Sequence, residues 1–197
     1  MTVLRNIAVY SGSFNPLHIG HLAIMKHMIG KAGFDMVYLI VSPKNPLKDS
    51  ISSDSGIDRY NAAVKAVSKH FGPISAIPTT AKVRVDDIEL TMPEPHYTIR
   101  TLDALREREP QNTFTLIIGA DNLAEIRRWK DYRRILLEYG VAAYPRKGID
   151  IDAVKQNLLS EDPAYKIQTL DAPMVDISST QLRTALSNGK DISHLLM

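Results

Sequence analysis

Apolar residues occur along this chain in two patterns that alternate from one end to the other. Short runs of consecutive apolar residues, clearest at 36–42 and 113–118, predict strands buried on both faces of a sheet. Longer stretches in which apolar residues recur every three or four positions predict helices with one buried face. The predicted strands are 5–11, 36–42, 74–79, 113–118, 140–144 and 166–170, and the predicted helices are 19–31, 57–71, 97–108, 122–137 (as one or two helices), 151–159 and 178–187, with a last turn at 192–196.

This alternation of strands and helices indicates βαβ units and a parallel sheet. In such sheets ligands bind at the carboxyl ends of the strands. Two stretches, 43–56 and 81–95, lack either pattern, and each contains two prolines. We expect both to be long loops that close over substrates, because long loops in a compact domain are usually functional.

Composition narrows the class of protein. The 197 residues predict a single domain over 1–197, and the absence of cysteine excludes a disulfide scaffold, a thiolate metal site and a cysteine nucleophile. The net charge of +2 is too small to indicate a nucleic-acid partner. No run approaches the roughly 20 apolar residues of a membrane span, and the first residues do not read as a secretion signal. We therefore expect no membrane partner and a cytoplasmic protein.

The strongest candidate site is the segment Gly12-Ser-Phe-Asn-Pro-Leu-His-Ile-Gly-His21, between the first strand and the first helix. Glycines allow close backbone approach, and a helix N-terminus offers free N–H groups and partial positive charge. His18 and His21, three residues apart, can present their imidazoles on the same side of the opening turn. Together these groups suit a polyphosphate. The competing interpretations are a tight turn with capping histidines and, with less support, a metal site.

A second phosphate-type segment is Ile177-Ser-Ser-Thr-Gln-Leu-Arg183. Ser178, Ser179 and Thr180 favour a helix N-cap, and Arg183 lies one turn inside that helix. Hydroxyls, free N–H groups and a guanidinium fork bind phosphate well. Taken alone, the segment is also typical of an ordinary helix cap with a surface arginine.

Together the two segments resemble the signatures of the HxGH-type nucleotidylyltransferases, and most closely those of the bacterial nicotinate-nucleotide adenylyltransferases. The resemblance continues between them, in order, at 42–48, 96–102, 119–129 and 145–148. It implies a Rossmann-like α/β fold: a doubly wound, mostly parallel sheet with helices on both faces. It also implies that AMP is transferred from ATP to nicotinate mononucleotide, giving deamido-NAD and pyrophosphate.

The resemblance assigns roles to individual residues. His18, His21 and Arg183 are the implied catalytic residues, with the two histidines stabilising the α-phosphate and Arg183 holding the β- and γ-phosphates. The implied ATP-binding residues are Gly12, Ser13, Phe14, Gly20, Gly119, Asp121, Ile177, Ser178, Ser179 and Thr180. The implied residues for the mononucleotide are Ser13, Asn15, Lys44, Thr98 and Trp129, with Trp129 stacking on the pyridine ring. Mg²⁺ is expected to arrive on the ATP phosphates, without protein ligands.

Three departures from the family pattern stand out. Ser11 occupies the place of a common glycine, Leu47 that of a loop histidine, and Lys130 that of an aromatic residue in some relatives. Trp129 also fits a core position, Asp121 a helix N-cap, and Arg59 a structural role. The alternatives for function are nicotinamide mononucleotide or phosphopantetheine as the acceptor, or a nucleotide-binding module without catalytic activity.

Overall fold

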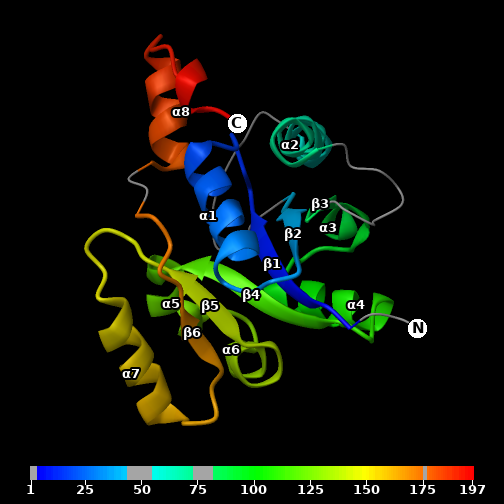
Figure 1. The fold of residues 1–197 in the computed structure, drawn as a ribbon, viewed down its shortest axis with the longest axis vertical. Coiled ribbons are helices and arrows are strands. Elements are labelled where there is room, and N and C mark those ends of the chain that lie inside the picture. Colours follow the sequence, from blue (N-terminus) through cyan, green and yellow to red (C-terminus); the bar gives the residue numbers. More distant parts are fainter. Residues whose placement is uncertain (1–3, 44–54, 73–81, 175–176) are drawn as a thin grey trace.

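The computed structural model describes residues 4–43, 55–72, 82–174 and 177–197. In these residues six strands form one sheet in the order β3-β2-β1-β4-β5-β6, and every neighbouring pair is parallel (Figure 1). The order reverses between β1 and β4, which is where ligands bind in doubly wound sheets. The strands are β1 (Asn6–Gly12), β2 (Met36–Val41), β3 (Val83–Asp86), β4 (Thr113–Gly119), β5 (Val141–Tyr144) and β6 (Ile167–Thr169).

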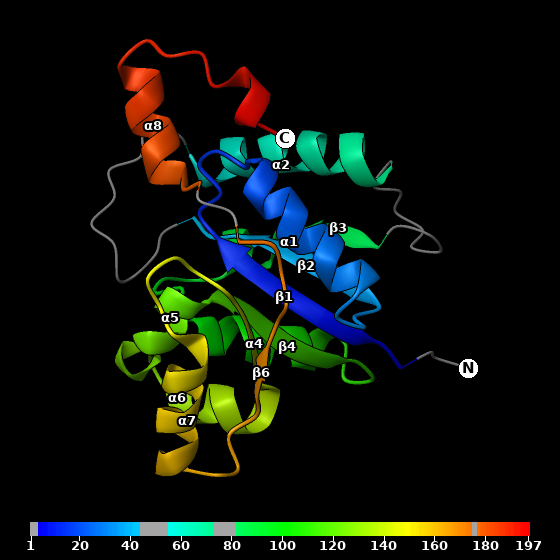
Figure 2. The same cartoon turned by 60° about the vertical axis from the view of Figure 1, so that its left-hand side comes forward.

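Helices cover both faces of this sheet, as the turned view in Figure 2 shows: α1 and α2 lie on one side and α4 to α7 on the other. The α-helices are α1 (Ile19–Gly30), α2 (Gly56–Phe71), α3 (Ile88–Thr91), α4 (Thr98–Arg108), α5 (Ala120–Ala124), α6 (Tyr132–Arg134), α7 (Ile151–Glu161) and α8 (Ser179–Ser187). The 3₁₀-helices are η1 (Ile126–Arg128) and η3 (Ser193–Leu195), and η2 (Ile135–Tyr139) is a π-helix. The expected Rossmann-like, doubly wound fold is confirmed.

The side chains of β1 alternate between two separate hydrophobic cores. Ile7 and Val9 belong to the core beneath α4, α5 and η2, whereas Ala8 and Tyr10 belong to the core beneath α1 and α2. Successive side chains of a strand point to opposite faces, so a strand covered on both faces must be apolar throughout. The same alternation continues to Ser11, which lies on the same side of the sheet as Ile7 and Val9 and contacts Glu89 on α3.

The prediction of a long loop over 81–95 was wrong for most of its length. Val83 and Val85 are buried in β3, which pairs with β2, and α3 follows directly. The alternation of valine with arginine and aspartate there is a strand pattern, although only four residues long. The predicted strand 74–79 lies outside the described residues, as does the part of the predicted loop 43–56 from 44 to 54.

The predicted helical stretch 122–137 is broken into four short pieces, α5, η1, α6 and η2. The main break follows Arg128, and within it Asp131 adopts a left-handed conformation with φ of 52°. A residue with positive φ cannot continue a right-handed helix. The break matters for the site because Trp129 sits in it, between two turns, rather than on the side of a continuous helix.

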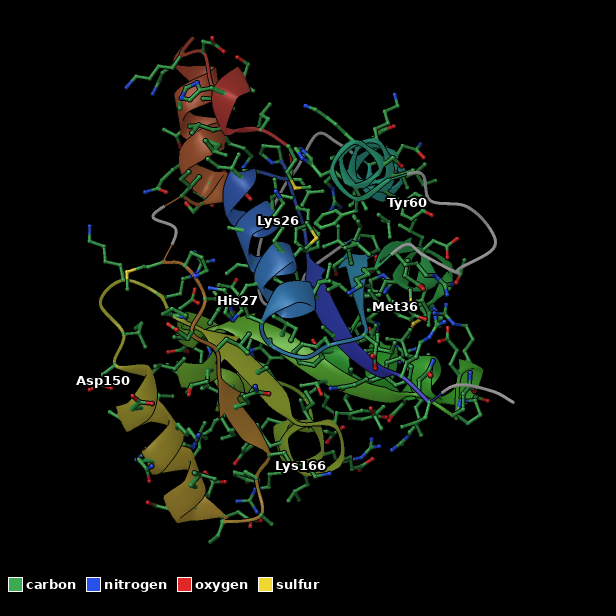
Figure 3. All side chains as sticks on the ribbon, in the orientation of Figure 1. Lys26, His27, Met36, Tyr60, Asp150 and Lys166 are labelled. Atoms are coloured by element: carbon green, nitrogen blue, oxygen red, sulfur yellow. The ribbon has the colours of Figure 1, made fainter. Side chains whose placement is uncertain are left out.

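The loops that follow β1, β4 and β5 gather at one edge of the sheet. Met36, at the start of β2, and Lys166, just before β6, are labelled in Figure 3 and mark the opposite, amino edge. No helix within the described residues is long and apolar enough to cross a membrane. Because the loops after β1, β4 and β5 share one edge of the sheet, the candidate residues from the sequence can meet there.

Candidate active site

Two cavities open at the carboxyl edge of the sheet. The histidine cavity, with about 250 Å³ of open volume, is lined by Tyr10, His18, Gly20, His21, Ile24, Tyr144, Pro145, Arg146, Pro173 and Ile177. The tryptophan cavity, with about 720 Å³, is lined by Ser11, Gly12, Ser13, Ser42, Glu89, His96, Tyr97, Thr98, Leu116, Ile118, Arg128, Trp129 and Lys130. Tyr10 lines the first and Ser11 the second, so the alternation of β1 assigns the cavities to opposite faces of the sheet. The turn after β1 contributes residues to both.

Gly12 and Phe14 shape that turn. Phe14 has φ of 44°, unusual for a residue with a side chain, and its buried ring packs edge-on against Tyr10 and His21. A Cβ at position 12 would lie 3.1 Å from the tip of the Phe14 ring. Such a contact is too close without a shift of the ring, so glycine at 12 allows Phe14 to support His21 from below.

His18 and His21 cap α1 with their side chains. The Nδ1 atom of His18 accepts a hydrogen bond from Gly20 N, and Nδ1 of His21 accepts one from His18 N, both at 3.2 Å. An imidazole nitrogen that accepts carries no proton, so in both neutral rings the hydrogen is on Nε2. The ring centroids are 3.7 Å apart. The capping interpretation of the pair is therefore correct, and it leaves two adjacent Nε2–H donors available to a ligand.

The surroundings of both imidazoles favour the neutral form. Burial, and then the Arg146 guanidinium, lower the pKa of His18 to about 4. The pKa of His21 is also lowered, first by burial and then by His18 and Arg146. Burial is the larger cause of both shifts, and the smaller contribution of the Arg146 guanidinium is positive charge that a polyphosphate would neutralise.

The start of α8 packs against the turn that carries the histidines, although the two segments are far apart in sequence (Figures 1 and 2). Ser179 Oγ donates to Pro16 O at 3.1 Å, and Arg183 Nη1 donates to Asn15 O at 2.7 Å. Arg183 Nη2 donates to Thr180 Oγ1 at 3.1 Å. The two candidate phosphate segments are thus in direct contact, and of the second segment Ile177 lines the histidine cavity.

Ser178 has a different part in this arrangement. Its hydroxyl accepts from Gln181 N at 3.2 Å, and Gln181 Oε1 accepts from Ser178 N at 2.8 Å. This reciprocal capping box fixes the first turn of α8. The ordinary interpretation of Ser178 as a helix cap is correct, and the cap fixes the position of the residues that touch the histidine turn.

Gly119 and Asp121 lie beside Arg146, next to the histidine cavity. Asp121 is in the first turn of α5, where Gly119 is the N-cap residue, and its Oδ1 is 3.6 Å from Arg146 Nε. A Cβ at position 119 would collide with the Asp121 carboxylate and come within 3.0 Å of Arg146 Nε. A side chain at position 119 would therefore force the Asp121 carboxylate and the Arg146 side chain to shift.

Thr98 and Trp129 meet in the tryptophan cavity, together with Gly12 and Ser13. Thr98 is the first residue of α4, and Trp129 also packs against the core on that face. Trp129 thus packs against the core, as a core position requires, and also lines the cavity. Lys44, predicted to approach a substrate phosphate, lies outside the described residues.

Arg59 on α2 holds the neighbouring backbone. Its guanidinium is buried and donates to Ser13 O, Ser42 O and Pro43 O at 2.7–2.8 Å. These contacts tie the turn after β1 to the segment after β2, which agrees with the structural role expected for Arg59.

Sequence reasoning gave no role to several residues that line the cavities: Tyr10, Tyr144, Pro173 and Arg146 in the first, and Ser11, Glu89 and His96 in the second. Arg146 could have been recognised as a candidate from the sequence, because it follows the predicted strand 140–144 at the same edge of the sheet. Glu89 carried none, since α3 was predicted to be part of a loop.

Comparison with known proteins identifies the family. The model of the cytidylyltransferase-like family matches residues 9–185. The chain belongs to the cytidylyltransferase-like family. A probable nicotinate-nucleotide adenylyltransferase of Flavobacterium johnsoniae is 36% identical over 190 residues, which cover 96% of this chain and 91% of that protein. One from Bacteroides fragilis is 37% identical over 188 residues, covering 95% and 85%.

Solved structures agree on the cytidylyltransferase-like fold. Plasmodium falciparum nicotinic acid mononucleotide adenylyltransferase, complexed with NaAD, superposes with a TM-score of 0.75 at 22% identity, covering 96% of this chain and 87% of that one. The same enzyme complexed with APC gives a TM-score of 0.67 at 21% identity, with the same coverage. At these identities the superpositions support the fold of this family member, whereas the relatives in sequence bear on its activity.

Proposed function

We propose that this protein is a nicotinate-nucleotide adenylyltransferase, which transfers AMP from ATP to nicotinate mononucleotide and releases pyrophosphate. The relatives above 30% identity, matched over nearly the whole chain, bear that name. The observation that carries the proposal is the turn from Gly12 to His18, which contributes to both cavities. A reaction that joins two nucleotides needs two pockets that meet at the reacting phosphate.

ATP occupies the histidine cavity in this proposal. His18 and His21 donate through Nε2–H to the α-phosphate, and Arg183 with the first turn of α8 holds the β- and γ-phosphates. Arg146 adds positive charge to the same cavity. Gly119 and Asp121 contact the adenosine, and Gly20 and Ile177 line the cavity that ATP occupies.

Nicotinate mononucleotide occupies the tryptophan cavity. Trp129 stacks on the pyridine ring beside Thr98, while Ser13 and Asn15 approach the phosphate at the histidine turn. Arg128 and Lys130 flank Trp129 at the same cavity, where their charge favours an anionic ring substituent.

The chemistry requires no protein nucleophile. A phosphate oxygen of the mononucleotide attacks the α-phosphorus of ATP, a new P–O bond forms, and the bond from the α-phosphorus to the bridging oxygen of pyrophosphate breaks. Catalysis of such a transfer depends on alignment and on stabilisation of the developing charge. Fixed Nε2–H donors, whose rings are oriented by backbone hydrogen bonds, supply that stabilisation without reorganisation.

Mg²⁺ enters as part of the substrate, bound to the ATP phosphates, where it neutralises part of their charge. The described residues contain no group of three or more His, Cys, Asp or Glu side chains that could hold a metal ion.

Pyrophosphate release with ATP and Mg²⁺ tests the proposal, run in parallel with nicotinate mononucleotide, nicotinamide mononucleotide and phosphopantetheine. We expect strong release with nicotinate mononucleotide and deamido-NAD as the product. Comparable release with the nicotinamide compound would make the enzyme one of dual specificity. Release with phosphopantetheine alone, or ATP binding without release for any acceptor, would refute the proposal.

A further inference from the structure

Glu89 is a buried carboxyl group to which the reaction above gives no role. Its side chain is part of the wall of the tryptophan cavity, and the residue is only 2% exposed. Oε1 accepts a hydrogen bond from Thr101 Oγ1 at 2.8 Å and a long one from Ser11 Oγ at 3.5 Å. Oε2 is buried and has no hydrogen-bond partner, and within the described residues no ion pair reaches the carboxylate.

A buried carboxylate oxygen without a donor is costly, since desolvation is not repaid. Natural proteins retain such groups mainly where a ligand or water satisfies them. The same cavity holds a second atom of this kind, Nδ1 of His96, in a residue that is 7% exposed. Two buried polar atoms without partners at one cavity indicate that a polar part of the ligand belongs there.

The contacts of Glu89 fix its place along that ligand. Ser11 is the residue before Gly12, at the phosphate end of the cavity. Thr101 is on the first turn of α4, three residues after Thr98, which the proposed function places beside the pyridine ring. Glu89 lies on α3 and contacts both of these elements through its Oε1 atom. In a mononucleotide, the part between phosphate and base is the ribose.

From this placement we propose that Glu89 accepts hydrogen bonds from the ribose hydroxyls of the mononucleotide acceptor. The assignment rests on the proposed function. A carboxylate is a pure acceptor and a ribose diol supplies two donors, the pairing by which acidic residues bind ribose in other nucleotide sites. The nicotinate carboxylate is no alternative partner, because two acceptors of like charge repel each other. The amide of a nicotinamide ring is a donor and is the competing partner that the experiment must exclude.

The test is a cycle that combines a variant with a substrate analogue. The kcat/KM of wild type and Glu89→Gln is measured with nicotinate mononucleotide and with its 2′-deoxy and 3′-deoxy analogues. We expect Glu89→Gln to lower kcat/KM about 10- to 100-fold, mainly through the KM of the mononucleotide, with the KM of ATP unchanged. With wild type, at least one deoxy analogue should lower kcat/KM by a similar factor. With Glu89→Gln, the same analogue should lower kcat/KM little further.

Three comparisons separate this role from others. Glu107→Gln, the same change at an exposed position of α4, should match wild type. Thr101→Val removes a donor to Oε1 but keeps the carboxylate, and should lower activity less than Glu89→Gln. If Glu89→Gln fails to fold, wild type alone still decides, because equal kcat/KM for the ribose substrate and both deoxy analogues would overturn the assignment.

The ribose assignment would also be overturned if Glu89→Gln and the deoxy analogue each lowered kcat/KM independently, so that their effects added. A loss of kcat/KM confined to nicotinamide mononucleotide would overturn it too, because that result places Glu89 at the ring substituent. No turnover of nicotinate mononucleotide by wild type would refute the proposed function, and this assignment with it. Turnover by wild type with an additive cycle would refute the ribose contact alone.

Discussion

At the scale of single residues, the geometry of His18 and His21 allows helix capping and phosphate binding together, although the sequence presents these two roles as alternatives. Each Nδ1 accepts a backbone N–H at the start of α1, and that hydrogen bond orients the ring. The same bond leaves the proton on Nε2, where a phosphate can use it. Capping is therefore the means by which this chain fixes its donors, which explains why a lone His-x-x-His pattern cannot distinguish the two.

Replacing either histidine by alanine should lower kcat about 10²- to 10³-fold, the usual cost of losing one fixed donor. Alanine at position 18 also removes a helix cap worth about 1 kcal/mol. His18→Asn separates the effects, because its amide oxygen can still cap α1 while the donor moves. We expect the melting temperature of His18→Asn to stay near that of wild type while kcat falls. The exposed His194→Ala serves as the control. Wild-type kcat in His18→Asn would contradict the role of Nε2.

Gly119→Ala should weaken ATP binding, because the added Cβ meets the Asp121 carboxylate and Arg146. The expected result is a rise of several-fold or more in the KM of ATP, with the KM of the mononucleotide little changed. Gly30→Ala is a matched control, since a Cβ at position 30 meets nothing within 4 Å. Equal ATP affinity in Gly119→Ala and wild type, measured by calorimetry, would show that the pair can move aside without cost.

At the scale of elements, α8 can serve as the second half of the proposed phosphate site only because it packs against the turn after β1. Its capping box is readable from sequence, and the structure adds the hydrogen bonds from Ser179 and Arg183 to the backbone of Pro16 and Asn15. Those contacts explain how a segment more than 150 residues away reaches the histidines.

Arg183→Lys should lower kcat/KM for ATP at least about tenfold, although the charge is kept. A lysine has no planar fork and cannot donate to Asn15 O and Thr180 Oγ1 in the same geometry. Arg133→Lys, at an exposed arginine on α6, should behave as wild type. Unchanged kinetics in Arg183→Lys would mean that charge alone suffices at this position.

Two elements, β3 and α3, were not predicted from the pattern of apolar residues. Strand β3 has four residues and α3 one turn, both too short to stand out from a proline-containing stretch. Their identity depends on neighbours: β3 is a strand because it pairs with β2. Glu89 was missed for this reason, since a residue in a presumed loop gives no sign of being buried.

At the scale of the whole molecule, the buried histidines make folding depend on pH. Their pKa values lie below the 6.5 of an unfolded histidine, that of His18 at about 4. As the pH falls below about 6.5, the unfolded chain takes up protons that the folded site excludes, so the folded state loses stability. Above that pH the histidines are neutral in both states, so they no longer make the free energy of unfolding depend on pH.

Chemical denaturation at pH values from 8 to 5 tests this. We expect the free energy of unfolding of wild type to fall between pH 7 and pH 5, and that of a His18→Asn/His21→Asn variant to fall less. Glu138 and Glu161, whose pKa values are lowered to about 2 by neighbouring hydrogen bonds, contribute mainly below about pH 5 and so outside this window. Parallel pH profiles for the two proteins would show that the site accepts imidazolium without cost.

The sequence by itself determined the order of most strands and helices, the parallel doubly wound sheet and the two segments of the phosphate site. These follow from local periodicity, from helix capping and from the rule that ligands bind at the carboxyl ends of parallel strands. Only the tertiary structure decided the tautomers of the histidines, the division into two cavities by the alternation of β1, and the burial of Glu89 and His96. Each of those depends on groups distant in sequence, whose packing no local pattern encodes.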